Sequence, residues 1–269
     1  MPSRGALGTM HTCERLPAPP PVRAAGVRVL TAVVSGGSRG IGRAIVEELA
    51  GCGYTVRFLY RSRDDAAAEV VAAVAARGGV AIAHRCDITD RDAVSAWIET
   101  LHAEPIHALV NNAAVLRDGH FLLMDESRWD IVVETVLGGA YRLTRGLVRP
   151  MLTAGAGRVV NVASLSGVLG RAGQVNYSAA KGAMVAFTKA LARELGRYGV
   201  TVNTVVPGWI DTELVAAMPE ARRARALADV PLGRFGRPTE VARVVSFLVS
   251  SRAAYVTGAT IRVDGGLGA

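Results

Sequence analysis

The sequence predicts an α/β fold, a single doubly wound domain whose central parallel sheet of about seven strands has helices on both faces. Three observations predict this class. Short apolar runs alternate with longer amphipathic segments from residue 27 to the C-terminus. The apolar runs are continuous, which is typical of strands buried on both faces of a parallel sheet. A glycine-rich turn at residues 35–42 joins the first apolar run to the first amphipathic segment.

Each element follows from the local pattern. Runs rich in valine and isoleucine predict strands, and segments with apolar residues three or four positions apart predict helices. The predicted strands cover residues 27–34, 54–60, 80–83, 106–110, 158–162, 200–206 and 260–263. The predicted helices cover residues 41–49, 64–76, 91–101, 129–148, 176–195 and 240–248. Residues 213–230 combine apolar side chains with arginines and predict a mobile helical lid.

The chain has 269 residues, of which 50% are hydrophobic and 20% charged, and this composition suits one large globular domain. We expect residues 27–269 to form that domain, because no linker or internal repeat interrupts them. Residues 1–26 contain a proline cluster and no apolar periodicity, so we expect a disordered extension rather than a secretory signal. No apolar run approaches the ~18 residues of a membrane span, so we expect a cytoplasmic protein with no membrane partner.

The formal net charge is +8, and nearly all of the positive charge is arginine, since lysine occurs only at positions 181 and 189. Arginine suits contacts with phosphate and carboxylate groups. The arginines are scattered along the chain without interleaved aromatic residues, so no nucleic-acid partner is expected. The three cysteines form no CxxC pair and the five histidines show no ligand spacing, so neither a disulfide framework nor a metal site is predicted.

The turn between the first strand and the first helix has the sequence Ser-Gly-Gly-Ser-Arg-Gly-Ile-Gly. Such a turn lets backbone amides approach a pyrophosphate, and the helix N-terminus adds partial positive charge. Its position after the first strand of a strand–helix series is the one that a Rossmann-type dinucleotide site requires. The predicted cofactor-binding residues of this turn are Gly36, Ser38, Arg39, Gly40, Ile41 and Gly42.

The end of the second strand indicates which nicotinamide cofactor binds. An acidic residue there would hold the ribose 2′-hydroxyl of NADH. The strand instead ends at Tyr60 and is followed by Arg61, with no carboxylate before Asp64. Arg61 and Arg39 together suit a 2′-phosphate, which favours NADPH. The alternative is that the Arg61 side chain only solvates the end of the strand.

Three side chains in the middle of the chain form a candidate catalytic group. Ser164 follows a predicted strand, and Tyr177 and Lys181 are four residues apart, hence on one face of a helix. An ammonium beside a phenol lowers the pKa of the phenol, which makes tyrosine a general acid for a carbonyl oxygen that becomes an alkoxide. A serine hydroxyl can hold the same oxygen by a second hydrogen bond. We therefore predict Ser164, Tyr177 and Lys181 as the catalytic residues.

This ordered set of motifs resembles the short-chain dehydrogenases/reductases, and most closely the 3-oxoacyl-(acyl-carrier-protein) reductases and the related polyketide ketoreductases. The resemblance also includes Asn-Asn-Ala-Ala at 111–114, Pro-Gly-Trp-Ile-Asp-Thr at 207–212 and Arg-Val-Asp-Gly-Gly at 262–266. It implies that Ser164 polarises the carbonyl, that Tyr177 donates the proton and that Lys181 binds the nicotinamide ribose. It implies further cofactor contacts at Asp87, Ile88, Asn111, Asn112, Ala113, Pro207, Gly208, Ile210 and Thr212.

The reaction that the resemblance implies is transfer of a hydride from NADPH to the β-carbonyl of a 3-oxoacyl thioester in fatty acid or polyketide biosynthesis. The product is the 3-hydroxyacyl thioester. The substrate is a small molecule or is bound to a carrier protein, and the expected assembly is a homotetramer. Two alternatives stay open. One is a reductase or dehydrogenase of another small ketone or secondary alcohol, and the other is a weakly active, cofactor-binding subunit of a mixed oligomer.

Three positions depart from the family pattern. Ser35 replaces the usual threonine and Ala114 the usual glycine, and both changes are tolerable where the backbone keeps a negative φ. Val136 replaces an asparagine that normally bends its helix and helps hold a water linked to the lysine. Valine offers no side-chain hydrogen bond, so Gly138 and Gly139 are the expected source of helix irregularity. Three consequences are open. Protons reach the lysine through backbone groups and water and activity is retained, the enzyme is slow, or the chain is an inactive subunit beside an active partner. We favour retained activity, because Ser164, Tyr177 and Lys181 are all present.

Overall fold

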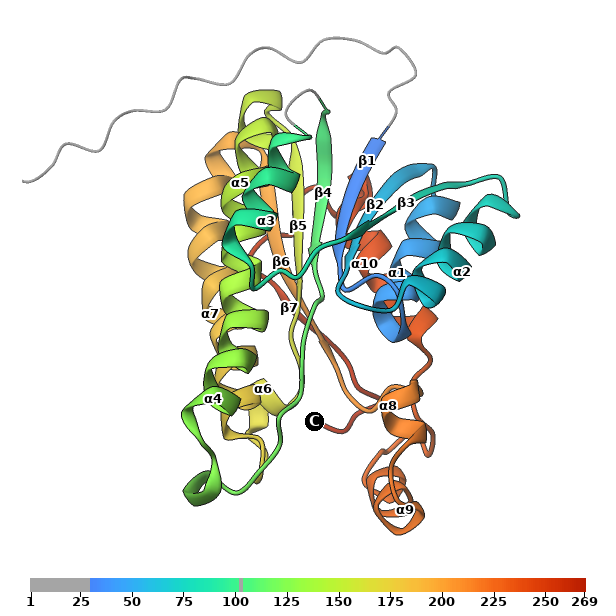
Figure 1. Cartoon of the computed structure of the whole chain (residues 1–269), viewed down its shortest axis with the longest axis vertical. Coiled ribbons are helices and arrows are strands. Elements are labelled where there is room, and N and C mark those ends of the chain that lie inside the picture. Colours follow the sequence, from blue (N-terminus) through green and yellow to red (C-terminus); the bar gives the residue numbers. More distant parts are fainter. Residues whose placement is uncertain (1–29, 102–103) are drawn as a thin grey trace, which may run out of the picture.

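The computed structural model of the chain describes residues 30–101 and 104–269, and the predicted extension 1–26 lies outside them. In this part of the chain, seven parallel strands form one sheet in the order β3-β2-β1-β4-β5-β6-β7 (Figure 1). The strands are β1 (Leu30–Ser35), β2 (Tyr54–Tyr60), β3 (Val80–Arg85), β4 (Ile106–Asn111), β5 (Gly157–Val162), β6 (Val200–Pro207) and β7 (Thr260–Val263). The parallel sheet confirms the fold class predicted from the sequence.

Helices cover both faces of the sheet. One face carries α1, α2 and α10, and the other carries α3, α5 and α7 (Figure 1). The helices are α1 (Gly40–Gly51), α2 (Asp64–Ala75), α3 (Arg91–Glu99), α4 (Glu126–Val133), α5 (Gly139–Ala154), α6 (Ser166–Leu169), α7 (Val175–Leu195), α8 (Glu213–Ala216), α9 (Glu220–Ala228) and α10 (Pro238–Val249). The turns η1 (Phe121–Leu123), η3 (Gly196–Tyr198) and η4 (Ser251–Ala253) are 3-10 helical, and η2 (Glu134–Gly138) is π-helical.

Apolar side chains from the strands fill the two layers between sheet and helices. Every residue of β6 is buried, as expected for a strand covered on both faces. On one face, Ile45 of α1 and Leu248 of α10 are fully buried in one cluster with Phe58 of β2. On the other face, Leu143 of α5 is fully buried in one cluster with Leu109 of β4. The packed sheet is a rigid platform for the loops that follow the carboxyl ends of the strands.

The strand order reverses beside β1, which pairs with β2 on one side and with β4 on the other. The connections that leave β1 and β4 run to opposite faces of the sheet (Figure 1). In open α/β sheets such a reversal leaves a crevice at the carboxyl ends of the two strands, and ligands bind there.

The helix predicted over residues 129–148 is the element that the structure changes most. It begins earlier, because the Asp125 side chain caps the first turn with a hydrogen bond of 2.8 Å to a backbone amide. The π-helical turn η2 then interrupts it around Val136, and α5 continues beyond Pro150. The irregularity therefore lies where the sequence predicted it.

Gly138 and Gly139 leave room that other side chains occupy. A Cβ atom at Gly138 would collide with the carboxylate of Glu134, and one at Gly139 would collide with the side chain of Ile88. Gly138 thus leaves space for the Glu134 carboxylate within η2. Gly139 lets the loop after β3 pack directly on the start of α5.

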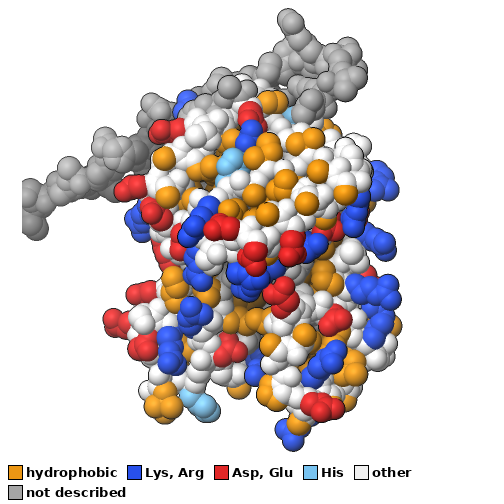
Figure 2. Space-filling view, turned by 45° about the vertical axis from the view of Figure 1, so that its right-hand side comes forward, with side chains coloured by type: hydrophobic (Ala, Val, Ile, Leu, Met, Phe, Trp, Pro, Cys, Tyr) orange, Lys and Arg blue, Asp and Glu red, His pale blue; other side chains and the backbone are white. Residues whose placement is uncertain are grey.

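The surface carries charges of both signs. On the face shown in Figure 2, Lys and Arg side chains lie among Asp and Glu side chains rather than in one patch. None of the helices within the described ranges is long and apolar enough to cross a membrane.

Candidate active site

A cleft of about 1190 Å³ lies at the carboxyl ends of the strands, where the strand order reverses. The structure brings nearly all of the predicted site residues together in it. Those that line the cleft are Gly36, Ser38, Arg39, Gly40, Ile41, Gly42, Arg61, Asp87, Ile88, Asn112, Ala113, Ser164, Tyr177, Lys181, Pro207, Gly208, Ile210 and Thr212.

Asn111 is the exception, because it does not line the cleft, and its role as a cofactor contact stays a prediction. Its side chain is buried below the cleft, where its amide nitrogen donates to Thr144 Oγ1 at 3.0 Å and to Asn161 Oδ1 at 2.8 Å. Asn161 in turn donates to Thr188 Oγ1 at 2.7 Å. Asn111 therefore belongs to a buried chain of hydrogen bonds that ties β4 and β5 to α5 and α7.

The glycine-rich loop leaves the first turn of α1 open toward the cleft. Gly36 has a φ of 68°, which favours glycine, and a Cβ atom at Gly42 would collide with the carbonyl oxygen of Gly36. Within the part of the chain that the structure describes, no side chain caps the amides of the first turn of α1. Open amides at a helix N-terminus beside a cleft are suited to a phosphate group. The loop therefore fits the pyrophosphate of a dinucleotide.

The end of β4 holds this loop in place. The Asn112 amide nitrogen donates to the carbonyl oxygens of Ser35 and Gly36, both at 3.1 Å. Ser35 Oγ accepts hydrogen bonds from the backbone amides of Asn112 at 3.0 Å and Ala113 at 3.1 Å. Serine therefore supplies the hydroxyl at a position where the family usually has threonine. Ala114 keeps a negative φ, since no non-glycine residue in the described ranges has a positive one.

Two arginines at one end of the cleft suit a phosphate. Arg39 and Arg61 line the cleft, and neither forms an ion pair within the described part of the chain. Arg63, by contrast, is bound to the carboxylate of Asp65 through hydrogen bonds of 3.0 and 2.9 Å. The two exposed guanidinium groups at positions 39 and 61 are thus available to an anionic ligand.

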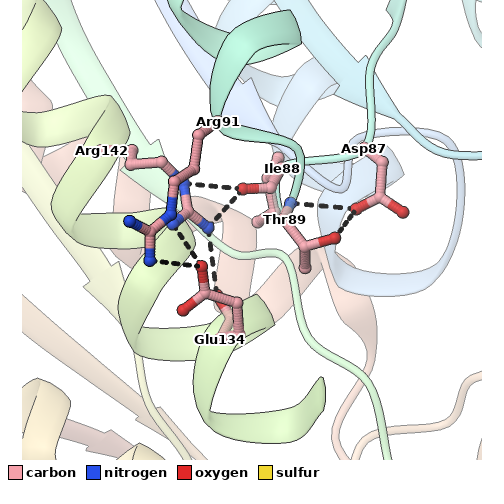
Figure 3. A network of polar contacts seen from close by, with 6 residues as sticks. All are labelled: Asp87, Ile88, Thr89, Arg91, Glu134 and Arg142. Carbon is pink, nitrogen blue, oxygen red and sulfur yellow. Dashed lines mark hydrogen bonds and ion pairs between the residues drawn. The ribbon is translucent and has the colours of Figure 1, made fainter. Parts of the chain in front are cut away.

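A network of polar contacts fixes the loop after β3, which carries Asp87 and Ile88 (Figure 3). The guanidinium of Arg142 donates to the carbonyl oxygen of Ile88 through Nε at 3.0 Å and Nη2 at 2.6 Å. Its Nη1 atom forms an ion pair with Glu134 at 2.5 Å. Asp87 Oδ1 accepts from the amide and the hydroxyl of Thr89 at 3.0 and 2.8 Å. Arg142 thereby joins the loop after β3 to the π-helical turn.

Ser164, Tyr177 and Lys181 come from two adjacent elements, the end of β5 and the first turns of α7. Asn176 anchors the start of α7, because its buried amide nitrogen donates to the carbonyl oxygens of Arg117 and Arg128, both at 3.0 Å. The Tyr177 hydroxyl shares a hydrogen bond with the Ser164 side chain. The first two of the three side chains therefore meet at one point of the cleft.

Lys181 lies beneath this pair. Its side chain is 2% exposed, its Nζ atom donates to the Val162 carbonyl oxygen at 2.5 Å, and it lies 5.8 Å from the centre of the Tyr177 ring. Burial lowers the pKa of Lys181 to about 7. Burial also raises the pKa of Tyr177 to about 12, although the hydrogen bond with Ser164 acts in the opposite direction.

The sequence predicted that the lysine would lower the pKa of the tyrosine, and for the chain by itself this is wrong. Desolvation of the phenolate is the largest effect on Tyr177. The buried lysine carries its full positive charge only below neutral pH, because burial lowers its own pKa to about 7.

A family model described as enoyl-(acyl carrier protein) reductase matches residues 36–268. The chain belongs to the short-chain dehydrogenase/reductase family. It is 42% identical over 238 residues to the 3-oxoacyl-(acyl-carrier-protein) reductase of Vibrio harveyi, with 88% of this chain and 96% of that protein covered. The corresponding protein of Escherichia coli (strain K12) is 38% identical over 238 residues with the same coverage. The acetoacetyl-CoA reductase of Shinella zoogloeoides is 42% identical over 238 residues, covering 87% of this chain and 97% of that protein.

Membership of the short-chain dehydrogenase/reductase family confirms the predicted class of enzyme. The protein is an oxidoreductase that acts on CH–OH or C=O groups, and its family uses a nicotinamide cofactor. The fold, the glycine-rich loop and the Ser164, Tyr177 and Lys181 side chains agree with this class.

Val136 departs from the short-chain dehydrogenase/reductase pattern, but the π-helical turn forms with valine at this position. Its side chain is 2% exposed and packs in an apolar cluster with Val132, Ala180 and Met184. The π-helical turn forms around it without a side-chain hydrogen bond from position 136. The ion pair between Glu134 and Arg142 and the space at the two glycines support the turn instead.

Several residues that line the cleft were not predicted from the sequence, among them Thr135, Arg171 and Gln174. The hydroxyl of Thr135 is buried and has no hydrogen-bond partner within the described ranges. Gln174 joins two segments, since its amide donates to Asp118 at 2.9 Å and accepts from Ser166 Oγ at 3.1 Å. Only their proximity to the known motifs in the sequence could have indicated these positions.

Proposed function

We propose that this protein reduces the β-carbonyl of a 3-oxoacyl thioester to the 3-hydroxyacyl thioester with NADPH. The observation that carries the proposal is the convergence of Ser164, Tyr177 and Lys181 in the same cleft as the glycine-rich loop. The relatives, which are named 3-oxoacyl and acetoacetyl reductases, support the same substrate class.

The residues present fit a nicotinamide dinucleotide. The open amides at the start of α1 suit its pyrophosphate. The Thr135 hydroxyl, which has no partner among the described residues, offers a further polar contact inside the cleft. Asp87 and Ile88 would hold the adenine, and Pro207 and Thr212 would cover the carboxamide. When bound, the nicotinamide supplies the hydride for the carbonyl carbon. Arg39 and Arg61 favour NADPH over NADH, because their free guanidinium groups suit a 2′-phosphate.

The proton comes from Tyr177. Because burial raises the pKa of Tyr177 to about 12, the phenol keeps its proton at neutral pH and meets the carbonyl oxygen as a donor. Ser164 Oγ accepts a hydrogen bond from the Ser166 amide at 3.2 Å, which fixes the serine so that its hydroxyl can donate to the same oxygen. Lys181, whose pKa is about 7, exchanges protons near neutral pH and would return a proton to the phenolate of Tyr177.

The test is NADPH oxidation, followed by absorbance, with acetoacetyl thioesters of coenzyme A and of an acyl carrier protein. We expect oxidation with these ketones and none with crotonyl thioesters, which have a double bond in place of the ketone. Tyr177→Phe should reduce turnover by about a thousandfold, since general acids contribute on the order of 10²–10⁴, and should leave NADPH binding unchanged. Full turnover in the phenylalanine variant would refute the assigned proton donor.

The same assay separates the two alternatives. Reduction of other small ketones without reduction of acetoacetyl thioesters would identify a different substrate class within the family. NADPH binding without turnover on any ketone would identify a silent subunit, which the Val136 departure allows. The presence of all three catalytic side chains in the cleft favours an active enzyme.

We propose in addition that the protein acts as a homotetramer in the cytoplasm. Helices α4 and α5 expose Trp129 and Tyr141, which are 36% and 50% exposed. The family resemblance implies that the helices after the fourth and fifth strands form one subunit interface, and α4 and α5 follow the fourth strand. Large aromatic side chains on a surface are typical of interfaces.

A further inference from the structure

Two arginines face the substrate half of the cleft from opposite walls. Arg171 lies in the loop between α6 and α7, on the wall that carries Ser164 and Tyr177. Arg222 lies in α9, which lies on the other side of the molecule from α6 at the same end (Figure 1). Both side chains line the cleft. The sequence placed Arg222 in the predicted lid and gave no role to Arg171.

Arg171 is held in position by an aromatic ring. Its guanidinium carbon lies 4.4 Å from the centre of the Trp209 ring, and its side chain is half-buried. A guanidinium stacked on a ring keeps its donors directed sideways, where they are available to a second partner. Arg171 thus has a fixed place in the wall of the cleft.

The charge around Arg171 is unbalanced. Burial lowers the pKa of Arg171, the positive charge of Arg222 lowers it further, and the carboxylate of Asp118 acts in the opposite direction. The Asp118 carboxylate is already bound to the Gln174 amide at 2.9 Å. Neither Arg171 nor Arg222 forms an ion pair with any residue in the described ranges. Two like charges that no carboxylate pairs within the described ranges therefore face the cleft, whose lining also includes Glu213, Arg225 and Asp229.

We propose that Arg171 and Arg222 form a subsite for an anionic group of the substrate, a phosphate or a carboxylate remote from the reacting carbonyl. An anion between two guanidinium groups replaces their repulsion with charge-assisted hydrogen bonds. A phosphate would come from the pantetheine arm of a thioester and a carboxylate from the acyl chain. This inference rests on the proposed function only in assuming that the substrate has a carbonyl that is reduced. The binding of an anion by the two arginines does not depend on that function.

The chain offers a matched control on the same helix. Arg223 is adjacent to Arg222, but its guanidinium carbon lies 5.6 Å from the centre of the Phe235 ring and it does not line the cleft. Arg223→Met removes the same charge from α9 as Arg222→Met. Arg61→Met tests the nucleotide half of the cleft in the same way.

The experiment measures binding by calorimetry in low salt to the full chain and to the Arg171→Met, Arg222→Met, Arg223→Met and Arg61→Met variants. The probes are two matched pairs, 4′-phosphopantetheine with pantetheine and hexanoate with hexanamide. We expect the wild type to bind one of the anions about tenfold or more tightly than its neutral partner, as for a charge-assisted contact. Arg171→Met and Arg222→Met should abolish this preference, and Arg223→Met and Arg61→Met should retain it.

The outcomes separate the subsite from the proposed reaction. A preference for phosphopantetheine assigns the anion to the thioester arm, and a preference for hexanoate assigns it to the acyl chain. Equal binding within both pairs would overturn the subsite, as would a preference lost in Arg61→Met and kept in Arg171→Met. Failure of acetoacetyl thioesters as substrates would refute the proposed function and leave this binding result as it is. Melting temperatures of the variants confirm that each one folds.

Discussion

At the scale of single residues, burial sets the protonation of the catalytic group. Lys181 is 2% exposed and has one acceptor, the Val162 carbonyl oxygen, within the described ranges. An ammonium with so little solvation loses its proton easily, and a buried phenol keeps its proton for the same reason. At neutral pH, Tyr177 is therefore a ready donor and Lys181 is close to its own pKa.

The pKa of Lys181 predicts how stability depends on pH. Between about pH 7 and pH 10.5 the unfolded chain retains a lysine proton that the folded chain has released, so raising the pH stabilises the fold. The wild type should gain about 2 kcal/mol more than Lys181→Met between pH 7 and pH 9, from the linkage between proton binding and folding. Urea unfolding of both proteins at the two pH values measures this difference. An identical change in both would contradict the lowered pKa.

Val136→Asn restores the amide that the family usually has. Val136 packs among apolar side chains, so an asparagine amide there would lack partners and should lower the free energy of unfolding by about 1–3 kcal/mol. Turnover should change by less than about fivefold, which is under 1 kcal/mol in activation free energy, because the π-helical turn exists without the amide. Unfolding and steady-state rates of the two proteins check both values. A change from no turnover to full turnover would show that the subunit is silent.

The sequence was sufficient for the residues whose spacing is local. Tyr177 and Lys181 lie on one helix, and Ser164 directly follows a strand, so a pattern in the chain predicts that they meet. Their pKa values depend on burial by distant segments, and the sequence predicted the wrong direction for Tyr177. The different places of Asn111 and Asn112 have a related reason. Asn111 is the last residue of β4 and its side chain binds Thr144, whereas Asn112 lies just beyond the strand and its side chain binds the glycine-rich loop.

At the scale of elements, the π-helical turn connects the catalytic and the nucleotide halves of the cleft. Thr135 in this turn lines the cleft, and Glu134 in the same turn binds Arg142, which holds the carbonyl oxygen of Ile88 (Figure 3). The sequence predicted an irregular helix here but not this connection. The contact between Ile88 and Gly139 joins segments that are far apart in the chain, so no local pattern indicates it.

This connection makes Arg142 a positioning residue for the cofactor loop. Arg142→Met removes two hydrogen bonds to the Ile88 carbonyl oxygen and the ion pair with Glu134. We expect KM for NADPH to rise about tenfold, since hydrogen bonds to charged groups contribute about 1.5–3 kcal/mol, and kcat to stay within about twofold. Arg91→Met, which removes a 3.8 Å ion pair with the same Glu134 carboxylate but no hydrogen bond to Ile88, is the matched control and should behave as the wild type. Fluorescence titration with NADPH should show the same loss of affinity; an equal fall in kcat would argue against a role confined to positioning.

At the scale of the whole molecule, the reversal of strand order beside β1 creates the cleft. The alternation of strands and helices in the sequence was sufficient to predict a parallel sheet. Five of the six helices predicted outside the lid recur with shifted ends, and the sixth is divided into α4, η2 and α5. The presence of Arg171 and Arg222 in one cleft was not predictable, because it depends on where α9 lies relative to the loop between α6 and α7. Long-range packing, and not local propensity, decides which charges share the substrate half of the cleft.

The exposed aromatic side chains of α4 and α5 give the last prediction, which concerns assembly. If Trp129 and Tyr141 lie in an interface, light scattering should give a mass about four times the 28.1 kDa of one chain. Tyr141→Glu buries a carboxylate in that interface, which is costly without a partner, so the variant should give about half the wild-type mass. Val80→Glu changes a residue that is 51% exposed at the edge of the sheet, outside the expected interfaces, and should leave the mass unchanged. A monomeric wild type would contradict the proposed tetramer, and a tetrameric Tyr141→Glu would place its interfaces elsewhere on the molecule.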